Sequence, residues 1–176
     1  MSTLNTSREL LRSTQTYMDM LKSFSSEEFQ KNPKDGSWSY SEVYSHILQV
    51  NTVSLMAIEK CLHGKQNVTN GSLPFLSRMI LFFGKFPLRI KAPENIASSV
   101  KKISIEDASN ALIKLKHRIE AITPKVSKIT SSCKINHPRL GMLNSEQWFR
   151  FMEIHNNHHL KQIERIRKSL LKNLHE

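Results

Sequence analysis

The chain has 176 residues, a formal net charge of +11, and 39% hydrophobic against 23% charged residues. This composition suits a globular protein with a substantial core and argues against wholesale disorder. The length suits a single domain over residues 1–176. No apolar run reaches the roughly 20 residues of a membrane-spanning helix, and the polar first ten residues carry no secretory signal. We therefore expect a cytoplasmic protein without a membrane span.

The excess of positive charge would assist contact with an anionic partner. Lysine and arginine are scattered from Arg8 to Lys172 without a dense basic block, and aromatic residues make up only 7%. Nucleic-acid-binding surfaces typically combine basic grooves with aromatic rings on which bases stack. We expect a solvated basic surface, with nucleic-acid binding as the weaker alternative.

Apolar residues recur at helical spacing in four long segments, and strand patterns are nearly absent. The predicted helices cover residues 6–24, 39–62, 104–122 and 144–171. Ser39 and Glu42 have the spacing of a capping box at the start of the second helix, and Asn144 and Gln147 have it at the start of the last. Four long helices predict an all-α protein, a four-helix bundle.

The connections between these helices are unequal in length. Residues 64–103 form a long crossover with a short apolar helix expected at 74–83. We interpret this crossover as a segment that covers the bundle, with contact to a membrane surface as the alternative because it is both apolar and basic. Pro124 is expected to end or kink the third helix, and residues 133–141 are expected to form a loop.

The two cysteines, Cys61 and Cys133, do not form a CxxC pair. Disulfides are rare in reducing compartments, and this chain shows no export signal. We therefore expect two free thiols rather than a disulfide.

Three of the eight histidines lie on apolar helix faces. His155 and His159 are four residues apart, so they share one face of the last helix, and Gln162 continues the same seam. His46 lies on the inner face of the second helix. Neutral imidazoles from two packed helices can bind one side of a metal ion and leave its other positions open. The pattern predicts a divalent metal site formed by His46, His155 and His159, with ordinary core histidines as the alternative.

Other catalytic motifs are missing from the sequence. It contains no G-x-S-x-G, P-loop or GxGxxG pattern. Asn156 stands where a zincin helix has its general base, so that mechanism is excluded. Of the remaining histidines, we expect His158 at the rim of the site and His137 near the mouth of its pocket.

Three segments resemble the DinB/YfiT-like superfamily of metal-binding four-helix bundles. They are residues 36–47 (GSWSYSEVYSHI), 137–148 (HPRLGMLNSEQW) and 155–162 (HNNHHLKQ). The resemblance implies an up-down-down-up bundle, frequent homodimers, and His46, His155 and His159 as the ligands of a zinc, nickel or iron ion. The middle segment is similar to a subgroup of unknown function.

The relatives in this superfamily include metal-dependent hydrolases and thiol S-transferases. The resemblance therefore implies a metal-dependent enzyme that activates water or a thiol, acts on a small-molecule substrate and takes a thiol cosubstrate in the second case. Gln162, one turn past His159, would hydrogen-bond a metal ligand or bound water. The alternatives are a non-catalytic metal-binding or interaction module and, less favoured, a basic nucleic-acid-binding protein.

Overall fold

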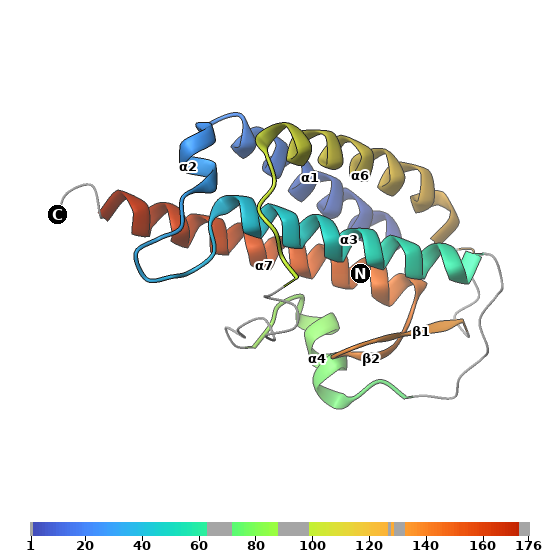
Figure 1. Cartoon of the computed structure of the whole chain (residues 1–176). Helices are drawn as coiled ribbons and strands as arrows, with labels where there is room; N and C mark the ends of the chain where they lie inside the picture. Colours follow the sequence, from blue (N-terminus) through green and yellow to red (C-terminus); the bar gives the residue numbers. More distant parts are fainter. Residues whose placement is uncertain (1, 63–71, 88–98, 127, 129–132, 173–176) are drawn as a thin grey trace.

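The computed structural model describes residues 2–62, 72–87, 99–126, 128 and 133–172 (Figure 1). Its four long helices are α1 (Thr3–Leu21), α3 (Tyr40–Leu62), α6 (Ile105–Val126) and α7 (Ser145–Lys172). Helices α1 and α7 run in one direction, and α3 and α6 run in the other, so the bundle is up-down-down-up (Figure 1). Helices α1 and α3 each pack against both α6 and α7. The predicted all-α four-helix bundle is confirmed.

A pair of polar side chains marks the start of α3, and another pair marks the start of α7. The Ser39 backbone N–H donates to Oε2 of Glu42 at 2.8 Å, and the Glu42 N–H donates to Oγ of Ser39 at 3.3 Å. The Asn144 N–H donates to Oε1 of Gln147 at 3.0 Å, and the Gln147 N–H returns a bond to Oδ1 of Asn144 at 2.9 Å. Both predicted capping boxes are confirmed, and they fix where α3 and α7 begin.

The helix predicted to end or kink near Pro124 continues to Val126. The missing N–H of Pro124 removes only one hydrogen bond in the last turn. Ile122 and Val126 on either side are buried in the core, and this packing holds the turn in helical geometry. The first predicted helix, residues 6–24, corresponds to α1, which ends at Leu21. The short α2 (Ser26–Gln30) follows it outside the predicted range.

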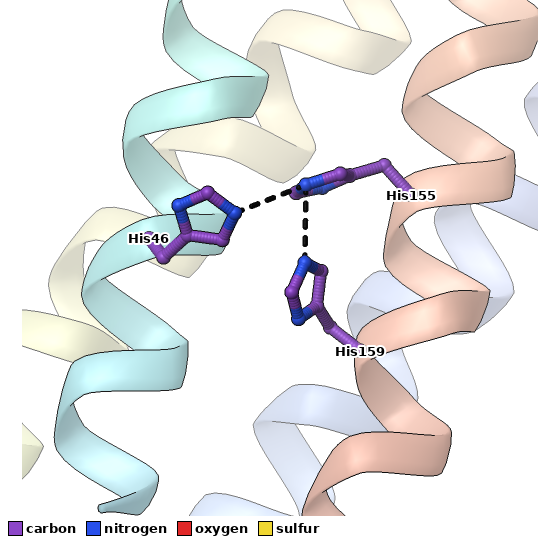
Figure 2. Close-up of side chains that lie close together, drawn as sticks. All are labelled: His46, His155 and His159. Carbon is purple, nitrogen blue, oxygen red and sulfur yellow. Dashed lines mark hydrogen bonds between the residues drawn. The ribbon is translucent and has the colours of Figure 1, made fainter. Parts of the chain in front are cut away.

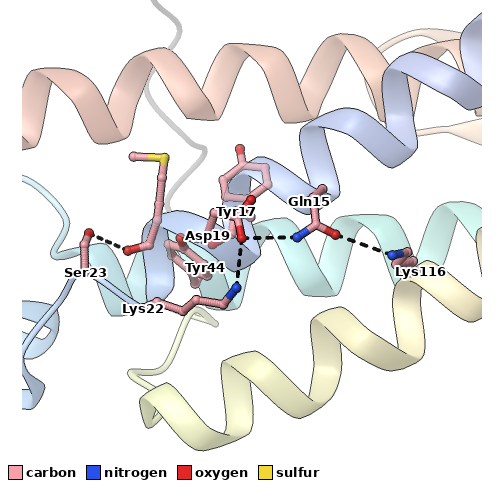
Figure 3. A network of polar contacts seen from close by, with 8 residues as sticks. Gln15, Tyr17, Asp19, Lys22, Ser23, Tyr44 and Lys116 are labelled. Carbon is pink, nitrogen blue, oxygen red and sulfur yellow. Dashed lines mark hydrogen bonds and ion pairs between the residues drawn. The ribbon is translucent and has the colours of Figure 1, made fainter.

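Aromatic and polar contacts hold α1 in the bundle. The Tyr44 hydroxyl on α3 donates to the Tyr17 carbonyl at 2.8 Å, and the two rings meet edge to face with centroids 5.4 Å apart (Figure 3). On the outer side, Gln15 donates to Asp19 at 3.2 Å and accepts from Lys116 of α6 at 3.4 Å (Figure 3). Helix α1 is thus tied to α3 through its buried side and to α6 through its surface.

The crossover contains α4 (Phe75–Phe83), which packs against α7. The rest of the crossover falls partly at 63–71 and 88–98, outside the described residues. Helix α4 buries Ser77 and Ile80 and leaves most of its other large apolar side chains exposed. The predicted helix at 74–83 is confirmed. Among the described residues, no helix is long and apolar enough to cross a membrane.

The segment predicted as a loop at 133–141 contains strands. Strands β1 (Lys134–His137) and β2 (Gly141–Asn144) form a small antiparallel hairpin, so the expectation of a loop here was wrong. Nδ1 of His137 accepts the backbone N–H groups of Arg139 and Leu140, both at 3.1 Å, and Gly141 closes the turn with φ +79°. Four-residue strands carry too little alternation to stand out in the sequence.

The prediction of two free thiols was also wrong. Cys61, in the last turn of α3, and Cys133, just before β1, form a disulfide with their Cα atoms 5.6 Å apart. They are separated by 72 residues, and only the packing of the hairpin against α3 brings them together. That proximity is a tertiary property with no local pattern in the sequence.

Candidate metal centre

The three predicted histidines meet in the structure. His46 comes from α3, His155 and His159 come from α7, and their rings point toward one another (Figure 2). Each residue is only 7% exposed. One ring nitrogen from each lies within 4.8 Å of the others, and this group of described residues contains no carboxylate or thiol.

The close approach of the rings is between Nε2 atoms. Nε2 of His155 lies 3.2 Å from Nε2 of His46 and 3.1 Å from Nε2 of His159. Zinc–nitrogen bonds of about 2.0–2.1 Å place neighbouring ligand nitrogens about 2.9–3.4 Å apart, for angles between about 90° and 109°. Both separations from His155 fall in that range, so the residues present fit a shared divalent ion.

Gln162 fixes the tautomer of one ring. Its Oε1 lies 2.7 Å from Nδ1 of His159. An amide oxygen only accepts, so Nδ1 of His159 carries the hydrogen and Nε2 keeps its lone pair toward the cluster. Partners of this kind orient metal-binding histidines and raise their basicity. The hydrogen bond between Gln162 and a candidate ligand was predicted, and the structure contains it.

Burial keeps the rings neutral. Desolvation, followed by the charge of His158, lowers the pKa of His46 to about 4. Desolvation, followed by the charge of His46, lowers the pKa of His159 to about 3. The pKa of His155 is also well below its ordinary value, chiefly through burial. Neutral imidazoles present the lone pairs that a metal ion requires.

The three rings do not satisfy one another as plain core residues. Nδ1 of His46 and Nδ1 of His155 are buried without a hydrogen-bond partner in the described part of the chain. A buried polar group left unpaired costs about 1–3 kcal/mol. A cation held by the Nε2 atoms would replace the close nitrogen–nitrogen contacts with coordination bonds. It would not pair the two Nδ1 atoms, which point away from the Nε2 atoms of their rings.

A buried amide network behind the cluster sets the register of the helices. Nδ2 of Asn51 on α3 donates to Oδ1 of Asn156 on α7 at 2.8 Å. Asn156 also donates to Oγ of Ser13 at 3.3 Å and accepts at its carbonyl from the Tyr17 hydroxyl at 2.6 Å. This network locks α1, α3 and α7 together one residue from His155. Sequence reasoning missed it, although an asparagine on the inner side of a helix was the available signal.

Aromatic rings surround the cluster. The ring centroids of Trp38 and His46 are 5.1 Å apart, and those of Phe151 and His155 are 5.4 Å apart. His158, predicted at the rim, is partly buried with its ring centroid 5.1 Å from that of His159. His137 does not join the cluster: it caps the hairpin turn, and its ring packs against Phe151 at 4.4 Å.

The fold and the histidine group define a four-helix-bundle protein with a candidate metal centre between two of its helices. The model of the DinB superfamily matches residues 9–163, and the chain belongs to this superfamily. The predicted membership is confirmed. A search of curated proteins gives no match.

Two solved structures share the fold. One is YfiT from Bacillus subtilis, described as a probable metal-dependent hydrolase with an unusual four-helix bundle topology. It is 13% identical to this chain, with a TM-score of 0.62, and the match covers 97% of this chain and 90% of YfiT. The other is TT2238, described as a four-helix bundle protein; it has 15% identity and a TM-score of 0.58, over 93% of this chain and 98% of that one. At these identities the likeness establishes the fold alone.

Proposed function

We propose that this chain is a metal-dependent enzyme, a hydrolase or a thiol S-transferase, acting on a small-molecule substrate. The observation that carries the proposal is the convergence of His46, His155 and His159: one ring nitrogen from each lies within 4.8 Å of the others, and Nε2 of His155 lies 3.1–3.2 Å from Nε2 of the other two. The description of YfiT as a probable metal-dependent hydrolase supports the same class of reaction. When bound, a zinc, nickel or iron ion would supply a Lewis acid that activates water or a thiol.

The chain's own residues would prepare the site. Burial keeps the three imidazoles neutral, and Gln162 holds His159 with Nε2 facing inward. Three protein ligands leave coordination positions open, which is typical of catalytic rather than structural sites. The rings of Trp38 and Phe151 pack against His46 and His155. The thiol cosubstrate and the homodimer stay predictions from the family resemblance.

The test is turnover by metal-loaded protein on a panel of ester, amide, phosphoester and thiol-transfer substrates. We expect His155→Ala to abolish turnover while the variant keeps wild-type helicity. The matched control is His117→Ala, which removes an exposed histidine from α6. Full activity in His155→Ala would contradict the proposal. A metal-loaded wild-type protein that turns over nothing would favour the non-catalytic metal-binding module instead.

A further inference from the structure

A second feature of α7 lies next to the histidine cluster. A hollow of about 220 Å³ opens between α7 and the segment that follows α4; we call it the α4–α7 hollow. Its lining includes Lys85, Phe86, Ile154, His158, Lys161 and Arg165. The residues from α7 recur every three or four positions, so they share one face of that helix.

The wall of the hollow formed by residues 84–87 is fixed to α7. Gly84 ends α4 in the left-handed conformation, with φ +67°, and its N–H donates to the Ile80 carbonyl at 2.9 Å. The Arg150 side chain passes against Gly84, where a Cβ would collide with it, and its Nε donates to the Leu81 carbonyl at 3.2 Å. Arg150 also pairs with Glu153 on its own helix. The end of α4 is therefore held against α7.

His158 connects the hollow to the candidate metal centre. Its ring lines the hollow and packs edge to face against Phe86, with centroids 5.3 Å apart. The same ring lies 5.1 Å from the ring of His159. A group seated in the hollow would therefore be about one imidazole away from the cluster.

The described side chains that line the hollow carry charge of one sign. Lys85, Lys161 and Arg165 line it, and none of its described lining residues carries a carboxylate. Glu153 lies one turn before Asn157 on the same helix, but it already pairs with Arg150 and accepts from Asn157 at 2.8 Å. Cationic side chains beside apolar ones suit a ligand that carries an anionic group on a short apolar segment.

We propose that the α4–α7 hollow binds the anionic end, a carboxylate or a phosphate, of the substrate processed at the three-histidine site. The inference rests on the proposed function for its substrate role. Lys85 and Lys161 recognise the anion, Phe86 and Ile154 contact the adjoining apolar carbons, and the reacting end extends past His158 toward the cluster.

The test uses phenyl phosphate as the probe and the full chain in its metal-free form, so that phosphate cannot bind through a metal ion. Amide chemical shifts followed by two-dimensional NMR would report both the affinity and the location. We expect shifts at residues 84–87 and 154–165, and binding about tenfold weaker in Lys85→Gln/Lys161→Gln. The control Lys114→Gln/Lys125→Gln removes the same charge from exposed positions on α6 and keeps wild-type affinity.

Equal affinity in the two double variants, or shifts spread over other basic surfaces, would overturn the inference. Measuring metal binding by Lys85→Gln/Lys161→Gln distinguishes a failure of this inference from a failure of the proposed function. If the variant binds the metal normally and the probe binds elsewhere, the hollow is excluded and the proposed function stands. If wild-type protein binds no metal while the hollow binds the probe, the substrate role is contradicted together with the proposed function.

Discussion

Acidification of the metal-free protein tests the burial of the candidate ligands. The pKa of His46 is about 4 in the folded chain, against an ordinary value of 6.5. Between these two values the unfolded chain binds a proton that the folded chain does not. The free energy of unfolding therefore falls as the pH drops below 6.5, and this loss levels off below the folded pKa of about 4. Above the ordinary value both states are neutral, and His46 adds no pH dependence.

The size of the effect follows from the two pKa values. At about pH 4.5 the linkage relation gives a loss of about 2–3 kcal/mol from His46 alone. The same sign applies to His159, whose pKa is lowered to about 3. Total stabilities of natural domains are about 5–15 kcal/mol, so the metal-free bundle should be markedly acid-labile.

Urea unfolding of wild type and His46→Gln, followed by circular dichroism in EDTA at neutral pH and at about pH 4.5, isolates this histidine. We expect the difference in unfolding free energy to move by about 2–3 kcal/mol in favour of the variant at the lower pH. The control His117→Gln removes an exposed histidine and should show no such movement. An unchanged difference for His46→Gln would refute the claim that its imidazole is buried and neutral.

Three further changes test the supporting structure. Gly84→Ala should lower the melting temperature more than Gly36→Ala, as measured by thermal unfolding. Both glycines have positive φ, but only at Gly84 does a guanidinium, that of Arg150, lie where the new Cβ would be. Reducing the Cys61–Cys133 disulfide should lower the unfolding free energy by up to about 4 kcal/mol, from the entropy of a closed loop, and equal urea midpoints with and without reductant would contradict this. Gln162→Leu should weaken metal affinity about 10–100-fold in calorimetric titrations, and an unaltered dissociation constant would contradict its orienting role.

The local part of the architecture could be predicted from the sequence. Helical periodicity identified the four long helices, and the spacing of capping side chains placed the starts of α3 and α7. The same periodicity put His46, His155 and His159 on inner faces, and helix packing then brought them together. Gln162 followed because it lies one turn beyond His159.

What the sequence did not disclose depends on contacts between distant segments. The Cys61–Cys133 disulfide requires the hairpin to pack on the end of α3, and no local pattern encodes that contact. The Asn51–Asn156 hydrogen bond joins residues 105 positions apart. The α4–α7 hollow likewise depends on the packing of the end of α4 against α7, to which the Arg150–Leu81 hydrogen bond and the contact between Phe86 and His158 contribute. These features are properties of tertiary packing.

The central claim is that His46, His155 and His159 bind one divalent ion. It is tested most directly by plasma mass spectrometry of untagged wild-type protein and of His155→Ala/His159→Ala. We predict about one equivalent of zinc, nickel or iron in the wild type, and its loss in a double variant that keeps its helical circular dichroism. No metal in the wild type after incubation with excess ions, or the same metal content in the double variant, would contradict the account.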